Sequence, residues 1–232
     1  ALVGAAPGFG PLAANMMTIA GGLPGFFDPN PWAFLGPQVR LGAELAGYYS
    51  TKPLEYTLST LIDPKLVPQM VALDPRLMTG LPRPITAATG MDALTHASEA
   101  FIGQWATSYT DRMALAAVGM IYDNLRVAYK NGKNLAAREQ MSLAATYAGL
   151  AFTRANVGYV HAIAHQLGGK YHTPHGLANA IMLPHVLAFL SPSITKKLAV
   201  LAVRANVGKS EERPAVLAKK FLASVETLNR DL

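Results

Sequence analysis

From Pro84 onward, apolar side chains recur at the spacing of amphipathic helices. The clearest run covers about 108–131, where Ser108 and Asp111 have the spacing of a capping box and Asn131-Gly132 is a typical stop. The same periodicity predicts further helices at about 135–154, 160–167, 175–190, 193–207 and 214–228. We therefore expect a mainly α, helical-bundle body.

The first 60 residues lack this periodicity. No charged residue occurs from Ala1 to Phe27, but glycine and proline interrupt the stretch before any apolar run reaches the ~20 residues that a bilayer-spanning helix needs. No basic segment precedes it, so we expect neither a membrane span nor a signal peptide. We predict an unassigned, irregular or partly α/β lead-in (1–60), a strand (69–73) with a linker (61–83), and a helical domain (84–232) that is incomplete at its C-terminal end.

Composition limits the possible chemistry. Hydrophobic residues make up 51% of the 232 residues and charged residues only 15%, which indicates a sizeable buried core and excludes a disordered chain. The chain has no cysteine, so any metal must be held by histidine and carboxylate, and we expect a cytoplasmic protein.

The net charge of +6 does not indicate nucleic-acid binding. From Arg126 to the end there are 14 basic and 5 acidic residues, and the basic ones stand singly or in pairs without a basic run or interleaved aromatics. We interpret this excess as a solvated helical face and expect no nucleic-acid partner.

The segment Gly8-Phe-Gly10-Pro-Leu-Ala13 formally matches a dinucleotide-binding loop, with Asp28 about twenty residues further on. The strand expected before such a loop is short and ends at Pro7, and the helix expected after it soon meets Gly21-Gly22. In so glycine-rich a segment we interpret the match as a chance one.

Histidines are the strongest chemical signal. Five of the six lie between His161 and His185, and no acidic residue occurs between Glu139 and Glu211. The best candidate for a carboxylate partner is Asp92, which lies four residues before His96, so both side chains share one helix face. His161 and His165 repeat this spacing.

His175 then opens the next predicted helix after a Thr-Pro turn. Any one of these residues alone is more often a hydrogen-bonded core histidine or an N-cap aspartate, but two spaced pairs and a further histidine favour a metal site. Three imidazoles and one carboxylate suit Fe²⁺, Zn²⁺, Co²⁺ or Ni²⁺ rather than Ca²⁺ or Mg²⁺. Such a site should release its metal below about pH 6, because ligation needs neutral imidazole.

Three segments together resemble the iron-dependent (group III) alcohol dehydrogenase family. They run from Asp74 through Thr-Gly-Met-Asp92-Ala-Leu-Thr-His96-Ala-Ser-Glu-Ala, from Gly158 through His161-Ala-Ile-Ala-His165-Gln-Leu-Gly-Gly, and from Thr173-Pro-His175-Gly to His185. The resemblance covers about 62–190, the metal-binding part of that family's helical C-terminal domain, whose fold is shared with dehydroquinate synthase.

This resemblance implies a role for each site residue. The metal ligands would be Asp92, His96, His161 and His175, and the ion Fe²⁺ or another divalent metal such as Zn²⁺. His165 would not be a ligand but a proton relay or orienting group near the nicotinamide and the substrate, and Phe152 would lie near the nicotinamide. The implied reaction is hydride transfer between NAD(P) and a small primary alcohol or aldehyde, with the metal acting as a Lewis acid on the substrate oxygen.

One departure keeps two alternatives open. Members of the family carry a Gly-Gly-Gly-Ser phosphate loop and a Thr- and Gly-rich stretch, and neither motif occurs in residues 1–60. One alternative is therefore a non-catalytic, metal-binding helical domain that lacks its nucleotide-binding half, which NADH affinity would reveal. The other is a lyase of the dehydroquinate synthase type, which product analysis would reveal. The oligomeric state is open, with a homo-oligomer among the alternatives.

Overall fold

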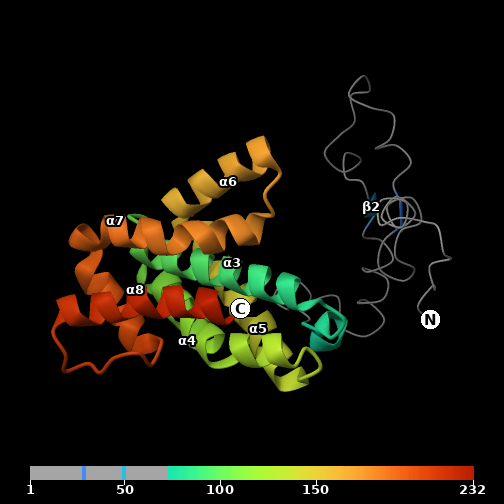
Figure 1. Ribbon diagram of the computed structural model, residues 1–232, viewed down its shortest axis with the longest axis horizontal. Coiled ribbons are helices and arrows are strands. Elements are labelled where there is room, and N and C mark those ends of the chain that lie inside the picture. The colour runs from blue at the N-terminus through green and yellow to red at the C-terminus, as the bar shows by residue number, and fades with distance from the viewer. Residues whose placement is uncertain (1–27, 30–48, 51–72) are drawn as a thin grey trace, which may run out of the picture. The chain divides into compact units, whose positions relative to one another are not determined.

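Two short strands form the described part of the N-terminal unit. The computed structural model describes residues 28–29, 49–50 and 73–232, and the chain divides into the units Ala1–Ala72 and Leu73–Leu232 (Figure 1). Strand β1 (Asp28–Pro29) pairs antiparallel with β2 (Tyr49–Ser50). The glycine-rich match at 8–13 and all but the last residue of the strand predicted at 69–73 lie outside the described residues.

Helices make up the second unit, which confirms the mainly α prediction. The 3₁₀-helix η3 (Pro75–Met78) is followed by α3 (Arg83–Ile102), α4 (Ser108–Lys130), α5 (Leu135–Ala155), α6 (Tyr159–Tyr171), α7 (His175–Arg204) and α8 (Pro214–Asp231).

The N-terminus of α4 is capped by a different pair from the one predicted. The sequence favoured Ser108 and Asp111, whereas Thr107 is the N-cap and Thr110 completes the capping box. The Thr110 N–H donates to Thr107 Oγ1 at 3.2 Å, and the Thr107 N–H donates to Thr110 Oγ1 at 2.8 Å. Ser108 is the first residue of the helix itself. Its backbone is therefore already helical, and it cannot be the N-cap, which has extended geometry.

Helix α7 covers the two helices predicted at 175–190 and 193–207. Pro184 and Pro192 both lie inside it, and the backbone leaves helical geometry at Ile194, where two helical segments join across a kink. Proline removes a backbone donor and crowds the carbonyl four residues earlier, which explains an interruption of the helix near Pro192. The two predicted helices are therefore present, and they join at Ile194 rather than between 190 and 193.

The core lies around α3, which packs against α4, α5 and α7, while α6 packs on α7 (Figure 1). Small side chains permit these close approaches, among them the fully buried Ala97, Ala100, Ala117 and Ala148. At Gly90 an added Cβ would overlap Leu125 of α4. The contacts with α4 and α5 fix α3 in place. Helix α3 also carries Asp92 and His96, which are described below.

Among the described helices, α7 alone is long and apolar enough to cross a bilayer by length and composition. It contacts α3, α6 and α8 within the helical unit. The absence of a membrane span and the cytoplasmic location therefore stay predictions.

Candidate metal centre

Helix α3 supplies the first two side chains of the site. Asp92 and His96 lie one turn apart, with Asp92 Oδ2 3.9 Å from His96 Nδ1. Both are partly buried, with side chains 22% and 20% exposed. Asp92 lies well inside the helix, so it is not the N-cap that an isolated aspartate after glycine can be.

The other two histidines come from the beginnings of α6 and α7. His161 is the third residue of α6, and His175 is the first of α7. Between these helices His172 adopts the left-handed conformation (φ 56°), and Pro174 caps α7 in extended geometry, so three residues suffice for the reversal. Gly176 lies against α3, where an added Cβ would overlap the carbonyl of Ala88. This close approach brings His175 beside Asp92.

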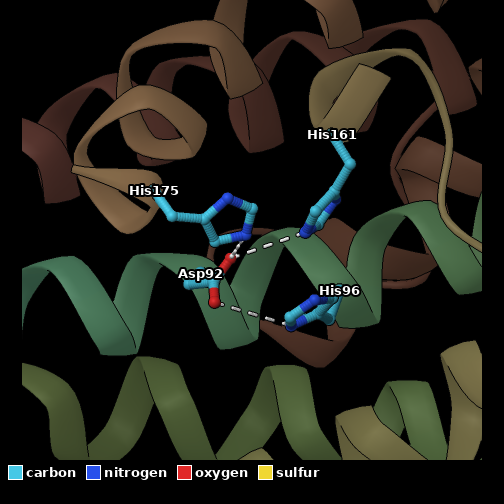
Figure 2. A group of neighbouring side chains, drawn as sticks. All are labelled: Asp92, His96, His161 and His175. Atoms are coloured by element: carbon cyan, nitrogen blue, oxygen red, sulfur yellow. Dashed lines mark ion pairs between the residues drawn. The ribbon is translucent and has the colours of Figure 1, made fainter. Parts of the chain in front are cut away.

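Figure 2 shows the three imidazoles gathered around the Asp92 carboxylate. Asp92 Oδ1 lies 3.3 Å from His175 Nε2 and 3.5 Å from His161 Nε2. One ligand atom from each of Asp92, His96, His161 and His175 lies within 4.8 Å of the others. The structure thus brings together the four residues that the family resemblance named.

Burial and neighbouring charges set the protonation of these groups. Burial lowers the pKa of His96 to about 4, outweighing the attraction of Asp92, so this imidazole is neutral at pH 7. Burial would raise the pKa of Asp92, but His161, His96 and Asn179 together lower it below the ordinary value. For His161, burial lowers the pKa, yet contacts with Asp92 and Glu99 prevail and raise it to about 9. A metal at His161 Nε2 would therefore compete with a proton.

The donor set fits a divalent transition metal. His161 Nε2 is buried and has no hydrogen-bond partner among the described residues, which is costly unless something else binds it. Metal–nitrogen and metal–oxygen bonds of about 2.0–2.2 Å in a tetrahedron place neighbouring ligand atoms roughly 3.3–3.6 Å apart. The two Asp92 Oδ1 distances fall in this range, and the N₃O composition suits Fe²⁺ or Zn²⁺.

His165 and Phe152 border this group without joining it. The His165 ring lies edge-on to His161, with centroids 5.9 Å apart, and is stacked with His175 at 5.3 Å. The Phe152 ring, from α5, is stacked on His96 at 4.2 Å. His172 and His185 are exposed and are not part of the four-residue group.

Sequence reasoning missed two further polar side chains. Glu99 Oε2 lies 2.6 Å from His161 Nδ1, and Asn179 Nδ2 donates to Asp92 Oδ1 at 2.6 Å. Both side chains are buried. Their spacing is a weak signal in the sequence: Glu99 follows Asp92 by seven residues and Asn179 follows His175 by four, so each shares a helix face with a predicted ligand.

Comparison with known proteins identifies the family. Residues 86–232 match the model of the "Fe-containing alcohol dehydrogenase family, C-terminal". The chain belongs to this family.

Individual relatives of this iron-containing family agree with the match. The chain is 53% identical over 136 residues to a 1,3-propanediol dehydrogenase of Citrobacter freundii, covering 59% of this chain and 35% of the relative. It is 39% identical over 171 residues to an NAD-dependent methanol dehydrogenase of Bacillus methanolicus, covering 74% of this chain and 45% of the relative. The crystal structure of a 1,3-propanediol oxidoreductase superposes with a TM-score of 0.67 at 47% identity, covering 68% of this chain and 41% of that one. The chain thus spans less than half the length of these relatives.

Proposed function

We propose that this chain provides the metal-binding part of an NAD(P)-dependent oxidoreductase that interconverts small primary alcohols and aldehydes. Asp92, His96, His161 and His175 hold a divalent metal, Fe²⁺ in the working enzyme. The observation that carries the proposal is the convergence of these four donor atoms from three helices within 4.8 Å. The names of the relatives support the substrate class and the nucleotide.

A divalent ion at this site would act as a Lewis acid toward the oxygen of the alcohol or aldehyde. Asp92 offsets part of the positive charge of the ion, and the fixed helix ends hold His161 and His175 in place, so the site is preorganised. His96 is neutral at pH 7 because of its burial, and it therefore offers a lone pair without first losing a proton.

His165 is assigned the role of proton relay. Its ring lies directly beside His161 and His175 yet outside the four-residue group, and its side chain is exposed on α6. An imidazole exchanges protons readily near neutral pH, so this position can pass a proton between the site and water. Phe152, stacked on His96, holds that ring from α5 and is assigned to the side of the site that faces the nicotinamide.

Two histidine variants test this division of roles. His175→Ala should lose most of the bound metal, measured by elemental analysis after anaerobic loading with Fe²⁺, because it removes one of four ligands. His165→Ala should retain metal and lose NADH-dependent aldehyde reduction. His185→Ala is the matched control, since His185 is exposed and stands apart from the group. Equal metal loss in His175→Ala and His165→Ala would contradict the assignment.

A fluorescence titration of NADH into the Fe²⁺-loaded chain tests the nucleotide. Saturable binding in the micromolar range is expected if the chain serves NAD(P)-dependent chemistry by itself. A chain that retains metal but does not bind NADH would instead act as a metal-binding domain only. Product analysis with a simple aldehyde separates dehydrogenase from lyase chemistry, since only the dehydrogenase yields the alcohol.

A further inference from the structure

The carboxylate of Glu99 lies behind the metal centre and binds the beginning of α6. Glu99 is on α3, is only 3% exposed, and does not belong to the four-residue group. Its Oε1 accepts a hydrogen bond from the Val160 N–H at 2.7 Å, and its Oε2 lies 2.6 Å from His161 Nδ1. Each oxygen therefore has one partner, and the two partners are consecutive residues of α6.

The bond to Val160 replaces a missing helix cap. Val160 is the second residue of α6, and its N–H belongs to the first turn, where no intrahelical acceptor exists. Gly158, the N-cap, offers no side-chain acceptor. A carboxylate at a helix N-terminus is further favoured by the helix dipole. Glu99 thus fixes the position of α6 relative to α3.

The bond to His161 decides which ring nitrogen carries a proton. One proton is shared between Glu99 Oε2 and His161 Nδ1, and a carboxylic acid is ordinarily a far stronger acid than imidazolium, so the proton belongs to Nδ1. When a metal takes the place of the proton on Nε2, the imidazole is neutral and offers its lone pair from that atom. That atom lies 3.5 Å from Asp92 Oδ1 and has no hydrogen-bond partner among the described residues.

We propose that Glu99 is the positioning residue of the metal centre, holding the His161 ring in orientation and in the tautomer that presents Nε2 to the metal. This inference rests on the proposed function, since it requires that Asp92, His96, His161 and His175 bind a metal. Partners that accept a hydrogen bond from the second ring nitrogen of a ligating histidine raise its basicity and fix its ring, and their loss typically weakens metal binding about 10- to 100-fold.

Glu99→Gln tests the proposal with almost no change of shape. Both partners of Glu99 are donors, but glutamine offers one acceptor oxygen and one NH₂ group, so one of the two donors must face another donor. We expect Zn²⁺ affinity, measured by competition with a chromophoric chelator, to fall about 10- to 100-fold. Glu139→Gln is the matched control: it removes the same charge from an exposed position on α5 and should leave the affinity unchanged.

A second measurement separates positioning from general support of the fold. In the Zn²⁺-loaded wild-type chain, ¹⁵N-correlated NMR of the histidine rings should show His161 protonated at Nδ1 and ligated at Nε2. In Glu99→Gln this ring should show a mixed or altered pattern while the far-ultraviolet circular dichroism stays that of the wild type. Unchanged Zn²⁺ affinity and an unchanged His161 pattern in Glu99→Gln would overturn the proposal.

Metal titrations of the wild-type chain distinguish a failure of the Glu99 proposal from a failure of the proposed function. If the wild-type chain binds no Zn²⁺ or Fe²⁺, the proposed function and this inference fall together. If Glu99→Gln does not fold, Gly158→Ala takes its place, because an added Cβ would lie 2.8 Å from Glu99 Oε1 and displace the carboxylate while keeping its charge. Weaker Zn²⁺ binding in this variant is expected, and wild-type binding would overturn the inference.

Discussion

At the scale of single residues, each of the four residues of the metal centre contacts a neighbouring side chain outside the group. Glu99 binds His161, Phe152 is stacked on His96, and Asn179 binds Asp92. The Asn179 Nδ2 also lies 3.0 Å from His175 Nε2, so one fully buried amide touches two of the four residues. The orientation of Asp92 therefore depends on a side chain that lies outside the four-residue group.

Replacing Asn179 should weaken metal binding without removing a ligand. Asn179→Ala deletes the donor to Asp92 Oδ1 and leaves that carboxylate free to turn, so we expect about a tenfold loss of Zn²⁺ affinity in chelator competition. Asn229→Ala is the matched control, because the Asn229 amide donates to the Ala180 carbonyl between α8 and α7. An equal loss of affinity in both variants would point to a general loosening of the helices.

The predicted residues and the missed ones differ in what their spacing shows. Asp92 with His96, and His161 with His165, form repeated i, i+4 pairs that stand out in a charge-poor chain. Glu99 and Asn179 share those helix faces, but a single Glu or Asn on a helix carries no comparable signal. Their roles become visible only when α6 and α7 are placed against α3, and spacing within one segment does not encode that placement.

At the scale of elements, the site depends on how closely the start of α7 approaches α3. Periodicity predicted most helix bounds within a few residues, since apolar faces and caps are local features. It also predicted a break between 190 and 193, and the two helical segments of α7 join at a kink at Ile194, close to that break. The close contact at Gly176 depends on two helices and cannot be read from either alone.

Gly176→Ala should disturb both stability and metal binding. The added Cβ would overlap the Ala88 carbonyl, and a backbone atom cannot turn aside, so α7 must shift and carry the adjacent His175 with it. We expect a loss of about 1–3 kcal/mol in the free energy of unfolding and weaker Zn²⁺ binding.

Gly149→Ala is the matched control, and urea titrations measure the free energy of unfolding of both variants. Gly149 lies in the interior of α5, and an added Cβ there would meet nothing within 4 Å. Alanine in a helix interior is favoured over glycine, so this variant should gain about 0.5–1 kcal/mol. Equal effects of the two substitutions would show that the start of α7 does not pack closely against α3.

At the scale of the whole helical unit, the last helix is held by a few polar bonds as well as by its apolar face. Phe221, Val225 and Leu228 of α8 are fully buried. Tyr122 of α4 shares a 2.7 Å hydrogen bond with Ser224, and Arg126 of α4 donates to Asp231 at 2.6 Å. The amphipathic pattern predicted that α8 would pack by one face. It did not predict that this face would pack against α4 and α7.

The buried Tyr122 phenol should make the stability of this packing depend on alkaline pH. Burial raises the pKa of Tyr122 to about 12 from an ordinary value of 10, although the Ser224 bond opposes the rise. Since the folded pKa exceeds the unfolded one, the stabilisation is complete below pH 10 and disappears as the pH rises to 12. Two pKa units correspond to about 3 kcal/mol in the free energy of unfolding.

Urea titrations between pH 9 and 12 should show this fall in the wild type and a shallower one in Tyr122→Phe. Tyr171→Phe is the control, because Tyr171 is exposed. A fall of equal steepness in all three chains would mean that the phenol of Tyr122 is not buried between α4 and α8.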